Sequence, residues 1–276
     1  MNNDTIGTAI MKKRKQLGYT QQKIADYLHV SFQAVSKWET GTAYPDINLL
    51  PQLAHILETT IDSLLGYSTV PITDYDKRYQ EEEYYWGLNP NEMCYEIMKI
   101  KPPVKSCRVL EIGCGEGKDA VFLARNGYQV SAFDVAEAGL EKARKLAHLN
   151  RVSINFFKAD IRDYCPDTFF DIVFCSGVLH YIASDLRAEF VNRIKEYTTV
   201  GGIHALNVFV DKPFIMPAPD REAVEIENGS WQSGELSGLY HDWLFHQNEE
   251  IIFECDSGGI PHKHCMDILI AEKMVG

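Results

Sequence analysis

Apolar residues recur along the chain at two different spacings. Up to residue 66 they recur three, four or seven positions apart, as Ile6, Ile10 and Leu17 do, which is the spacing of one helix face. From residue 108 onward, short apolar runs of strand length alternate with longer segments that keep the helical spacing. The change predicts two domains, the first all-helical and the second mixed.

Capping residues divide the N-terminal region into five short helices. Thr20 and Ser31 offer side-chain oxygens at the start of the second and third helices, and Asn48 is placed to cap the fourth. The fifth is expected over residues 60–65, with Gly66 as its C-terminal cap. We therefore expect a compact helical domain without strands.

The region from residue 108 predicts a doubly wound, mostly parallel, Rossmann-like α/β sheet. The expected strands are 108–112, 129–133, 153–157, 170–175 and 203–210, and the expected helices between them are 118–126, 136–149 and 184–198. Strands and helices that alternate at these lengths are typical of such sheets. Two more apolar strands, 251–255 and 266–272, follow without a helix between them, so we expect an antiparallel edge.

These patterns divide the chain into a helical domain (1–66), a linker (67–90) and an α/β domain (91–276). The linker is rich in tyrosine, glutamate and turn-forming residues. A free tether gains nothing from aromatic side chains, so we expect the second half of the linker to be ordered. It would serve either as a packing surface between the domains or as a lid over a ligand site. The residues concerned are Tyr75, Arg78, Tyr79, Tyr84, Tyr85 and Trp86.

Composition narrows the classes of protein that fit. The 276 residues are 45% hydrophobic and 24% charged, as in ordinary globular proteins, and no apolar run is long enough to span a bilayer. The seven cysteines form no CxxC pair and the N-terminus carries no signal-like segment, so we expect a cytoplasmic protein without disulfides or a membrane partner. The net charge of −12 falls on the part after residue 66, so any contact with nucleic acid is expected from the neutral N-terminal domain.

The N-terminal helices carry a helix-turn-helix pattern. Ala25 is small where the next helix crosses close above it, and Val35 and Trp38 attach the third helix to the core. This leaves one face of the third helix in solvent, where it can enter a major groove. The candidate DNA-binding residues are Phe32, Gln33, Ser36 and Lys37 on that face, with Gln21 as a phosphate contact.

Residues 5–66, which include LGYTQQKIADYLHVSFQAVSKWETG, resemble the phage-repressor/Cro (XRE-type) helix-turn-helix family. The resemblance implies binding to double-stranded DNA as a homodimer, and an ion pair between Arg14 and Glu39. His29 stands where the family usually has glycine, and histidine tolerates a left-handed backbone better than most residues. The alternative is a helical docking domain that does not bind DNA.

A glycine-rich segment, VLEIGCGEGKD (109–119), follows the first expected strand and opens a helix. Gly113, Gly115 and Gly117 allow a tight turn and let a ligand lie against bare backbone. A dinucleotide fingerprint would need glycine where Lys118 stands, and the P-loop pattern does not fit either. The turn therefore favours a ligand other than a pyrophosphate.

Two acids follow later strands of the same sheet. Asp134 ends the second strand, where a carboxylate can accept hydrogen bonds from ribose hydroxyls. Asp160 follows the third strand, where a carboxylate can accept from an adenine amine. The fourth strand ends in CSGVLHY, at the crevice where doubly wound sheets bind ligands.

Residues 85–273 resemble class I S-adenosylmethionine-dependent methyltransferases on these motifs, and GELSGLYHDW (234–243) is similar to the tellurite-resistance-type members. The resemblance implies S-adenosyl-L-methionine as cofactor. Ser237 and Gly238 stand where oxyanion-handling members tend to be basic, which disfavours tellurite as substrate. The implied cofactor-binding residues are Glu111, Gly113, Cys114, Gly115, Gly117, Asp134, Val135, Asp160, Ile161, Cys175 and Ser176.

Methyl transfer needs a base only when the acceptor is a protonated hydroxyl or amine. The candidates are His180, Tyr181, His241 and His264, each of which could equally be a packing residue. Several histidines and cysteines lie near the C-terminus, but their spacing is looser than the CxxC or HxxxH of common metal sites, so we expect no metal. That group comprises His241, His246, Cys255, His262, His264 and Cys265.

Two functions remain open from the sequence. The first is an enzyme that methylates a small molecule and is tethered to a sequence-specific DNA-binding domain. The second is a weakly catalytic or non-catalytic repressor that senses S-adenosylmethionine or an acceptor metabolite. DNA methylation is excluded because CSGVLHY lacks the Pro-Pro-Tyr/Phe motif that holds a flipped base, and because the α/β domain is acidic.

Overall fold

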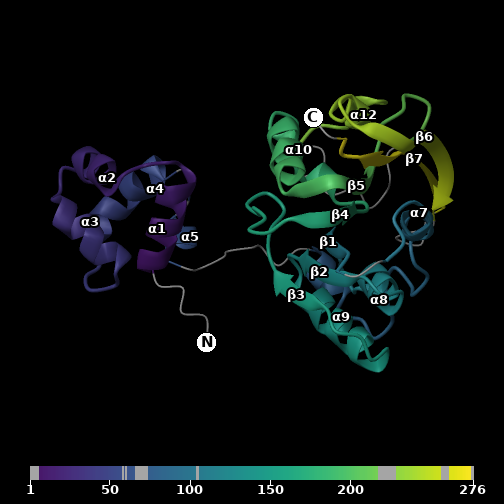
Figure 1. Cartoon of the computed structure of the whole chain (residues 1–276), viewed down its shortest axis with the longest axis horizontal. Helices are drawn as coiled ribbons and strands as arrows, with labels where there is room; N and C mark the ends of the chain where they lie inside the picture. The colour runs from purple at the N-terminus through teal and green to yellow at the C-terminus, as the bar shows by residue number, and fades with distance from the viewer. Residues whose placement is uncertain are drawn as a thin grey trace. The chain divides into compact units, whose positions relative to one another are not determined.

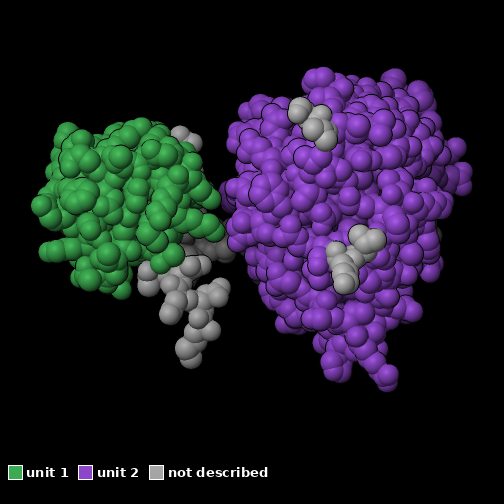
Figure 2. Space-filling model, in the orientation of Figure 1, with its two compact units in different colours: residues 1–71 green, residues 72–276 purple. Residues whose placement is uncertain are grey.

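A computed structural model describes residues 6–57, 59, 61–65, 74–103, 106–216, 228–255 and 261–274. The chain forms two compact units, residues 1–71 and 72–276 (Figure 2). The division falls inside the segment expected as a linker; Gly66 and the first part of that linker lie outside the described residues. Within the described ranges, no helix is both long and apolar enough to cross a membrane.

The N-terminal unit is helical, as expected. Its elements are α1 (Ile6–Gln16), α2 (Gln21–Leu28), α3 (Phe32–Glu39), the short 3₁₀ helix η1 (Ile47–Leu49), α4 (Leu50–Ile56) and α5 (Ile61–Leu64) (Figure 1). Thr20 and Ser31 cap α2 and α3 through their hydroxyl oxygens, which confirms both sequence assignments. Asn48 was the wrong residue for the next cap: the Asp46 carboxylate, two residues earlier, accepts the Asn48 amide at 2.8 Å and starts η1.

The core of this unit forms where the helices cross. Ile10, Ile24, Val35 and Leu53 are fully buried, each from a different helix. His29 ends α2 with a left-handed backbone (φ 54°), so histidine does take the place of the usual glycine in this turn. The turn sets the angle at which α3 leaves α2.

The second unit is an α/β domain with one seven-stranded sheet. Its helices are α6 (Asp74–Arg78), α7 (Glu92–Ile100), α8 (Lys118–Arg125), α9 (Glu137–Leu149), η2 (Leu179–Tyr181), α10 (Arg187–Glu196) and α12 (Glu235–Gly238). Its strands are β1 (Arg108–Ile112), β2 (Gln129–Asp134), β3 (Asn155–Lys158), β4 (Phe170–Cys175), β5 (Thr198–Phe209), β6 (Leu244–Cys255) and β7 (His262–Glu272). The strand order is β3-β2-β1-β4-β5-β7-β6, in which β1 to β5 are parallel and β7 is antiparallel to both neighbours.

The edge hairpin is longer than its apolar residues indicated. β6 begins at Leu244 rather than 251, and β7 begins at His262 rather than 266. The first half of β6, LFHQNEE, is largely exposed at the edge of the sheet, so it carries few apolar residues that could mark it as a strand. Pairing with β7 supplies the backbone hydrogen bonds that hold these polar residues in strand conformation.

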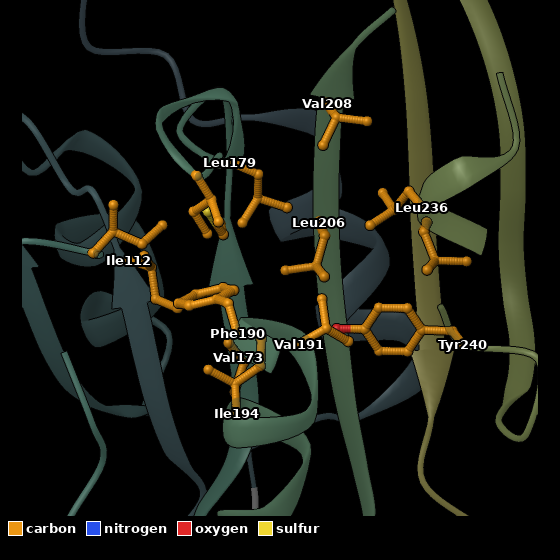
Figure 3. Packing of buried hydrophobic residues seen from close by; sticks show 14 of the residues in the cluster. Ile112, Val173, Leu179, Phe190, Val191, Ile194, Leu206, Val208, Leu236 and Tyr240 are labelled. Atoms are coloured by element: carbon orange, nitrogen blue, oxygen red, sulfur yellow. The ribbon is translucent and has the colours of Figure 1, made fainter. Parts of the chain in front are cut away.

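Two apolar layers cover the two faces of the sheet. Successive residues of a strand alternate between them: Leu110 and Ile112 point into the layer with α10 and α12, and Val109 points into the layer with α7, α8 and α9. Figure 3 shows Phe190 and Val191, from α10, among side chains of β1, β4 and β5. Both faces of the central strands are therefore covered, which leaves the ends of those strands for ligands.

A buried histidine connects β5 to the segment after α12. The His204 ring is fully buried; its Nε2 lies 2.7 Å from Thr198 Oγ1 and its Nδ1 lies 2.7 Å from the Tyr240 hydroxyl. Burial lowers the pKa of His204 well below its ordinary value, and the positive charges of Lys195 and Lys273 lower it further. The folded protein therefore holds this ring neutral at a pH where an unfolded chain would protonate it.

This histidine predicts a loss of stability on mild acidification. The unfolded state takes up a proton near pH ~6.5 and the folded state does not, so the free energy of unfolding should fall by up to about 1.4 kcal/mol per pH unit below that point. Thermal midpoints of the second unit, measured between about pH 5 and 8, should vary less in His204→Gln than in the native chain. His148→Gln, a change at an exposed histidine, serves as control. An equal dependence of the thermal midpoint on pH in all three proteins would contradict the prediction.

Candidate functional site

The sheet brings the expected site residues together at the carboxyl ends of β1, β2 and β4. Ile112, near the end of β1, pairs with Phe133 of β2 on one side and with Cys175 of β4 on the other. The chain runs to β2 on one side of β1 and to β4 on the other, so the crevice lies at the switch point of the sheet. Around it, Cys114 and Ile161 are buried and Val135 is half-buried.

The glycine turn after β1 has no room for side chains. Gly113, Gly115 and Gly117 have φ angles of 72°, 49° and 82°, a backbone region that favours glycine. A Cβ at Gly113 would lie 2.3 Å from Val178 Cγ2, and one at Gly117 would lie 2.6 Å from the Cβ of Ala143. Protein contacts therefore restrict these positions to glycine, and the contact of the turn with a ligand stays a prediction.

Asp134, at the end of β2, faces the glycine turn. One carboxylate oxygen accepts the Gly115 amide at 2.7 Å and the other accepts the Ala136 amide at 2.8 Å. Burial raises the pKa of Asp134, and the hydrogen bonds from Ala136 and Gly115 oppose that rise. The carboxylate thus joins β1 and β2 at the crevice, which is where a ribose contact was expected; that role stays a prediction.

Glu111 is a buried carboxylate beside the same turn, with 3% of its surface exposed. Among the described residues, none donates a hydrogen bond to its Oε2. Burial raises the pKa of Glu111 well above its ordinary value, and the negative charge of Asp119 adds to the rise. A buried carboxylate oxygen without a donor is costly, so this oxygen is suited to a cationic ligand.

Asp160 lies two residues beyond the end of β3, and its carboxylate is bound by the nearby Arg162. The Arg162 guanidinium bonds both oxygens of the Asp160 carboxylate, with Nη2 at 2.5 Å from Oδ2. More than half of the Arg162 side chain is exposed, so this arginine can be displaced toward solvent. An adenine contact at Asp160 stays a prediction, and in this structure the carboxylate is already satisfied.

Ser176, directly after β4, is held by two asparagines that were not among the predicted site residues. The side-chain amides of Asn91, which caps α7, and Asn207, in β5, each donate to Ser176 Oγ at 3.0 Å. Asn207 also accepts the Gly177 amide at 2.7 Å. A buried asparagine inside the apolar strand IHALNVFV was the available signal for Asn207.

Three of the four candidate bases belong to one series of ring contacts. The His180 ring lies 4.3 Å from that of Tyr181 and 6.0 Å from that of Phe209, and the Phe209 ring lies 4.8 Å from that of His264. His241 is different: it is exposed, and its Nδ1 lies 3.1 Å from the carbonyl oxygen of Gly238, in α12. The fold therefore groups His180, Tyr181 and His264 and leaves His241 outside the group.

The aromatic segment, residues 74–88, packs over the glycine turn. The Tyr79 hydroxyl would lie 2.8 Å from a Cβ at Gly115, and the Trp86 indole N–H donates to that hydroxyl at 3.2 Å. The Trp86 amide donates to the Glu116 carboxylate, which pairs with Lys142 of α9 at 2.6 Å. Burial raises the pKa of Tyr79 well above its ordinary value, and the negative charge of Asp134 adds to the rise. This segment is thus part of the second unit and covers the turn.

In the N-terminal unit, α3 presents the residues that the helix-turn-helix pattern selected. Phe32, Gln33 and Lys37 are exposed, and Ser36 is half-buried. Gln21 has a structural contact instead of a free side chain, because its amide donates to Glu39 at 2.7 Å. Its role as a phosphate contact stays a prediction.

The chain matches two family models. Residues 109–202 match a methyltransferase domain, and residues 10–64 match a helix-turn-helix domain. The Arg14–Glu39 ion pair expected from the helix-turn-helix resemblance is present, with Arg14 Nε 2.5 Å from Glu39 Oε1.

Several characterised proteins are similar to the α/β part. A ubiquinone biosynthesis O-methyltransferase of Rickettsia felis is 31% identical over 213 residues, which cover 66% of this chain and 86% of that protein. The match to the corresponding protein of Rickettsia bellii is 29% identical and spans about half of that relative's length (47%). The crystal structure of TehB from Haemophilus influenzae superposes with a TM-score of 0.58 at 21% identity, over 72% of this chain and 65% of that one, which shows a shared fold.

Proposed function

Because the chain belongs to the S-adenosyl-L-methionine-dependent methyltransferase family, we propose that it methylates a small molecule and is tethered to a sequence-specific DNA-binding domain. The observation that carries the enzymatic half is the buried Glu111 beside the glycine turn. S-adenosylmethionine is a cation with an ammonium and a sulfonium group. A buried carboxylate with an oxygen that no described residue satisfies fits such a ligand.

The residues divide into distinct roles toward this cofactor. Glu111 and the glycine turn would hold its amino-acid part, Asp134 its ribose, and Asp160 its adenine. When bound, the cofactor supplies an activated methyl group on sulfur. The protein supplies orientation and a site from which water is excluded. The aromatic segment supports the exclusion of water, since Tyr79 and Trp86 already lie over the turn.

The acceptor side of the crevice is formed by the segment after β4. The two amides on Ser176 fix the start of that segment, and His180 is 8% exposed a few residues on. The Rickettsia relatives are named for O-methylation, and a hydroxyl acceptor needs a base. We therefore propose a hydroxyl-bearing small molecule as acceptor and His180 as the base, with Tyr181 and His264 as neighbours that shape the pocket.

Release of S-adenosylhomocysteine tests this function. The full chain is incubated with S-adenosylmethionine and a panel of phenols, alcohols, thiols and amines, and cofactor binding is measured in parallel by calorimetry. Turnover on hydroxyl acceptors, lost in His180→Gln while cofactor affinity stays unchanged, is the expected result. Cofactor binding without turnover on any acceptor would instead favour the sensory interpretation.

The exposed face of α3 supports DNA binding by the first unit. Phe32, Gln33 and Lys37 are exposed on a helix that the Arg14–Glu39 pair fixes against α1. A single such helix contacts few bases, so we propose a homodimer that reads two half-sites about 34–36 Å apart. Because the second unit is acidic, we expect the DNA contact to come from the first unit.

Gln33 is expected to contribute base recognition and Lys37 general affinity. After selection of a preferred duplex from random sequences, Gln33→Ala should cost about 1–3 kcal/mol on that duplex and relax its sequence preference. Lys37→Ala should weaken binding to all duplexes about equally and reduce its salt dependence. The exposed Gln52→Ala, on α4, is the matched control. Equal affinity in all four proteins would show that α3 is not the DNA-binding element.

A further inference from the structure

The hairpin of β6 and β7 brings three residues of metal-binding types onto one face of the sheet. Cys255, the last residue of β6, is paired with His262, the first residue of β7. His264 follows two positions later, so its side chain points to the same face as that of His262. The next residue in the chain, Cys265, points to the opposite face and is buried in the layer with α10.

The three side chains converge at their donor atoms. One ligand atom from each of Cys255, His262 and His264 lies within 4.8 Å of the other two, and all three residues are half-buried. The Nε2 atoms of the two histidines are 2.8 Å apart, with their rings nearly perpendicular at 78°. The ring edges that carry these nitrogens therefore meet at one point instead of stacking face to face.

We propose that Cys255, His262 and His264 form a binding site for a zinc-like transition-metal ion. A thiolate with two imidazoles is a donor set typical of zinc, with ligand distances of about 2.3 Å to sulfur and 2.0–2.1 Å to nitrogen. For tetrahedral geometry these distances require about 3.3–3.4 Å between the nitrogens and about 3.5 Å between sulfur and nitrogen. The separations in this structure lie within a small side-chain adjustment of those values.

The position of the site relates it to the acceptor side of the crevice. The His264 ring contacts Phe209 at 4.8 Å, and Phe209 in turn contacts His180 at 6.0 Å. The ring of Phe253, from β6, also contacts the His264 ring, at 5.6 Å. The bound ion would thus hold the end of the hairpin in place next to the proposed acceptor pocket, with Phe209 between them.

Three protein ligands leave one position of a tetrahedral ion open. Structural zinc sites are normally closed by four protein ligands, whereas sites with three keep a place for water or another small ligand. The described residues supply three ligands toward such an ion. Metal binding itself depends only on the hairpin and does not require that the proposed methylation be correct.

The test is metal uptake by the untagged full chain after treatment with a chelator. Cobalt(II) serves as the probe, because a thiolate ligand gives it a charge-transfer absorption and tetrahedral coordination gives intense visible bands. We expect one cobalt per chain, displaced by zinc. Cys255→Ser should abolish the charge-transfer band. Loss of a residue that only hydrogen-bonds to a metal ligand lowers metal affinity by about 10- to 100-fold, and His264→Asn should lower zinc affinity by more than that.

Matched variants and a second measurement keep the result decisive. Cys165→Ser and His241→Asn remove the same residue types elsewhere and should bind cobalt as the native chain does. X-ray absorption of the native zinc-loaded chain should show one sulfur and two imidazole nitrogens, whatever the stability of the variants. No metal uptake, a spectrum without sulfur, or full uptake by Cys255→Ser would each overturn the proposal and leave only a hydrogen-bonded histidine pair.

Discussion

Replacing Glu39 by alanine is expected to unfold the helix-turn-helix domain while the methyltransferase unit stays folded. Glu39 is 8% exposed and accepts hydrogen bonds from two Arg14 nitrogens, at 2.5 and 3.0 Å, and from Gln21 at 2.7 Å. It therefore connects α1, α2 and α3 through one carboxylate. Its contact raises the pKa of Arg14, so the partner remains charged.

The expected cost is large because the change leaves a charge without its partner. Breaking a buried pair by removing one member costs about 3–5 kcal/mol. A domain of some sixty residues sits near the lower end of the usual stability of about 5–15 kcal/mol, so most of its stability would be lost. The remaining guanidinium is 13% exposed and cannot be fully hydrated without moving α1.

Hydrogen exchange on the full chain measures this effect in each unit separately. Amides of α1 to α4 should lose protection in Glu39→Ala, and DNA binding should disappear, while amides of β1, β4 and β5 and the affinity for S-adenosylmethionine stay unchanged. Asp26→Ala is the matched control, since it removes an exposed acid whose carboxylate accepts a hydrogen bond from Gln22 of the same helix. Protection in α1 to α4 equal to the native chain would show that the pair does not stabilise the domain.

Replacing Glu111 by glutamine is expected to weaken S-adenosylmethionine binding by about 10- to 150-fold. This corresponds to the roughly 1.5–3 kcal/mol of a hydrogen bond to a charged group. Glutamine keeps the size of the side chain and fills the same space, so the turn should keep its shape. The loss would then measure the charge of the carboxylate and not the packing around it.

Glu111 also predicts how this affinity depends on pH. Because burial raises its pKa, Glu111 keeps its proton to a higher pH than an ordinary carboxyl group, and binding of a cation to the protonated form requires loss of that proton. The affinity of the native chain should therefore rise with pH until the pKa of Glu111 in the free protein is passed. Calorimetry at a series of pH values should show this rise in affinity for the native chain and no rise for Glu111→Gln. Glu189→Gln, an exposed change on α10, is the control, and equal affinities in all three proteins would remove Glu111 from the site.

Contacts between distant residues separate the successful predictions from the unsuccessful ones. Apolar spacing predicted all seven strands of the sheet, and β1 and β4 to the residue, because both strands are buried on two faces and most of their positions are apolar. β6 was predicted too short because it lies at the edge, where polar residues are tolerated and backbone pairing alone defines the strand. Local pattern thus fails where burial does not constrain the sequence.

The sequence by itself determined the two domains, the helix caps at Thr20 and Ser31, and the glycine turn after β1, because each depends on residues close together in the chain. Only the tertiary structure decided what those residues contact. It directed the Gln21 amide to Glu39, paired Asp160 with Arg162, and brought Asn91 and Asn207 onto Ser176.

The C-terminal histidines show the same division most clearly. The spacing of Cys255, His262 and His264 matches no common local metal motif, so no metal site was expected in this part of the chain. They lie instead on two paired strands, whose register sets Cys255 opposite His262. Strand pairing is a long-range contact that no short sequence window contains, so the convergence of these three side chains was visible only once the chain was folded.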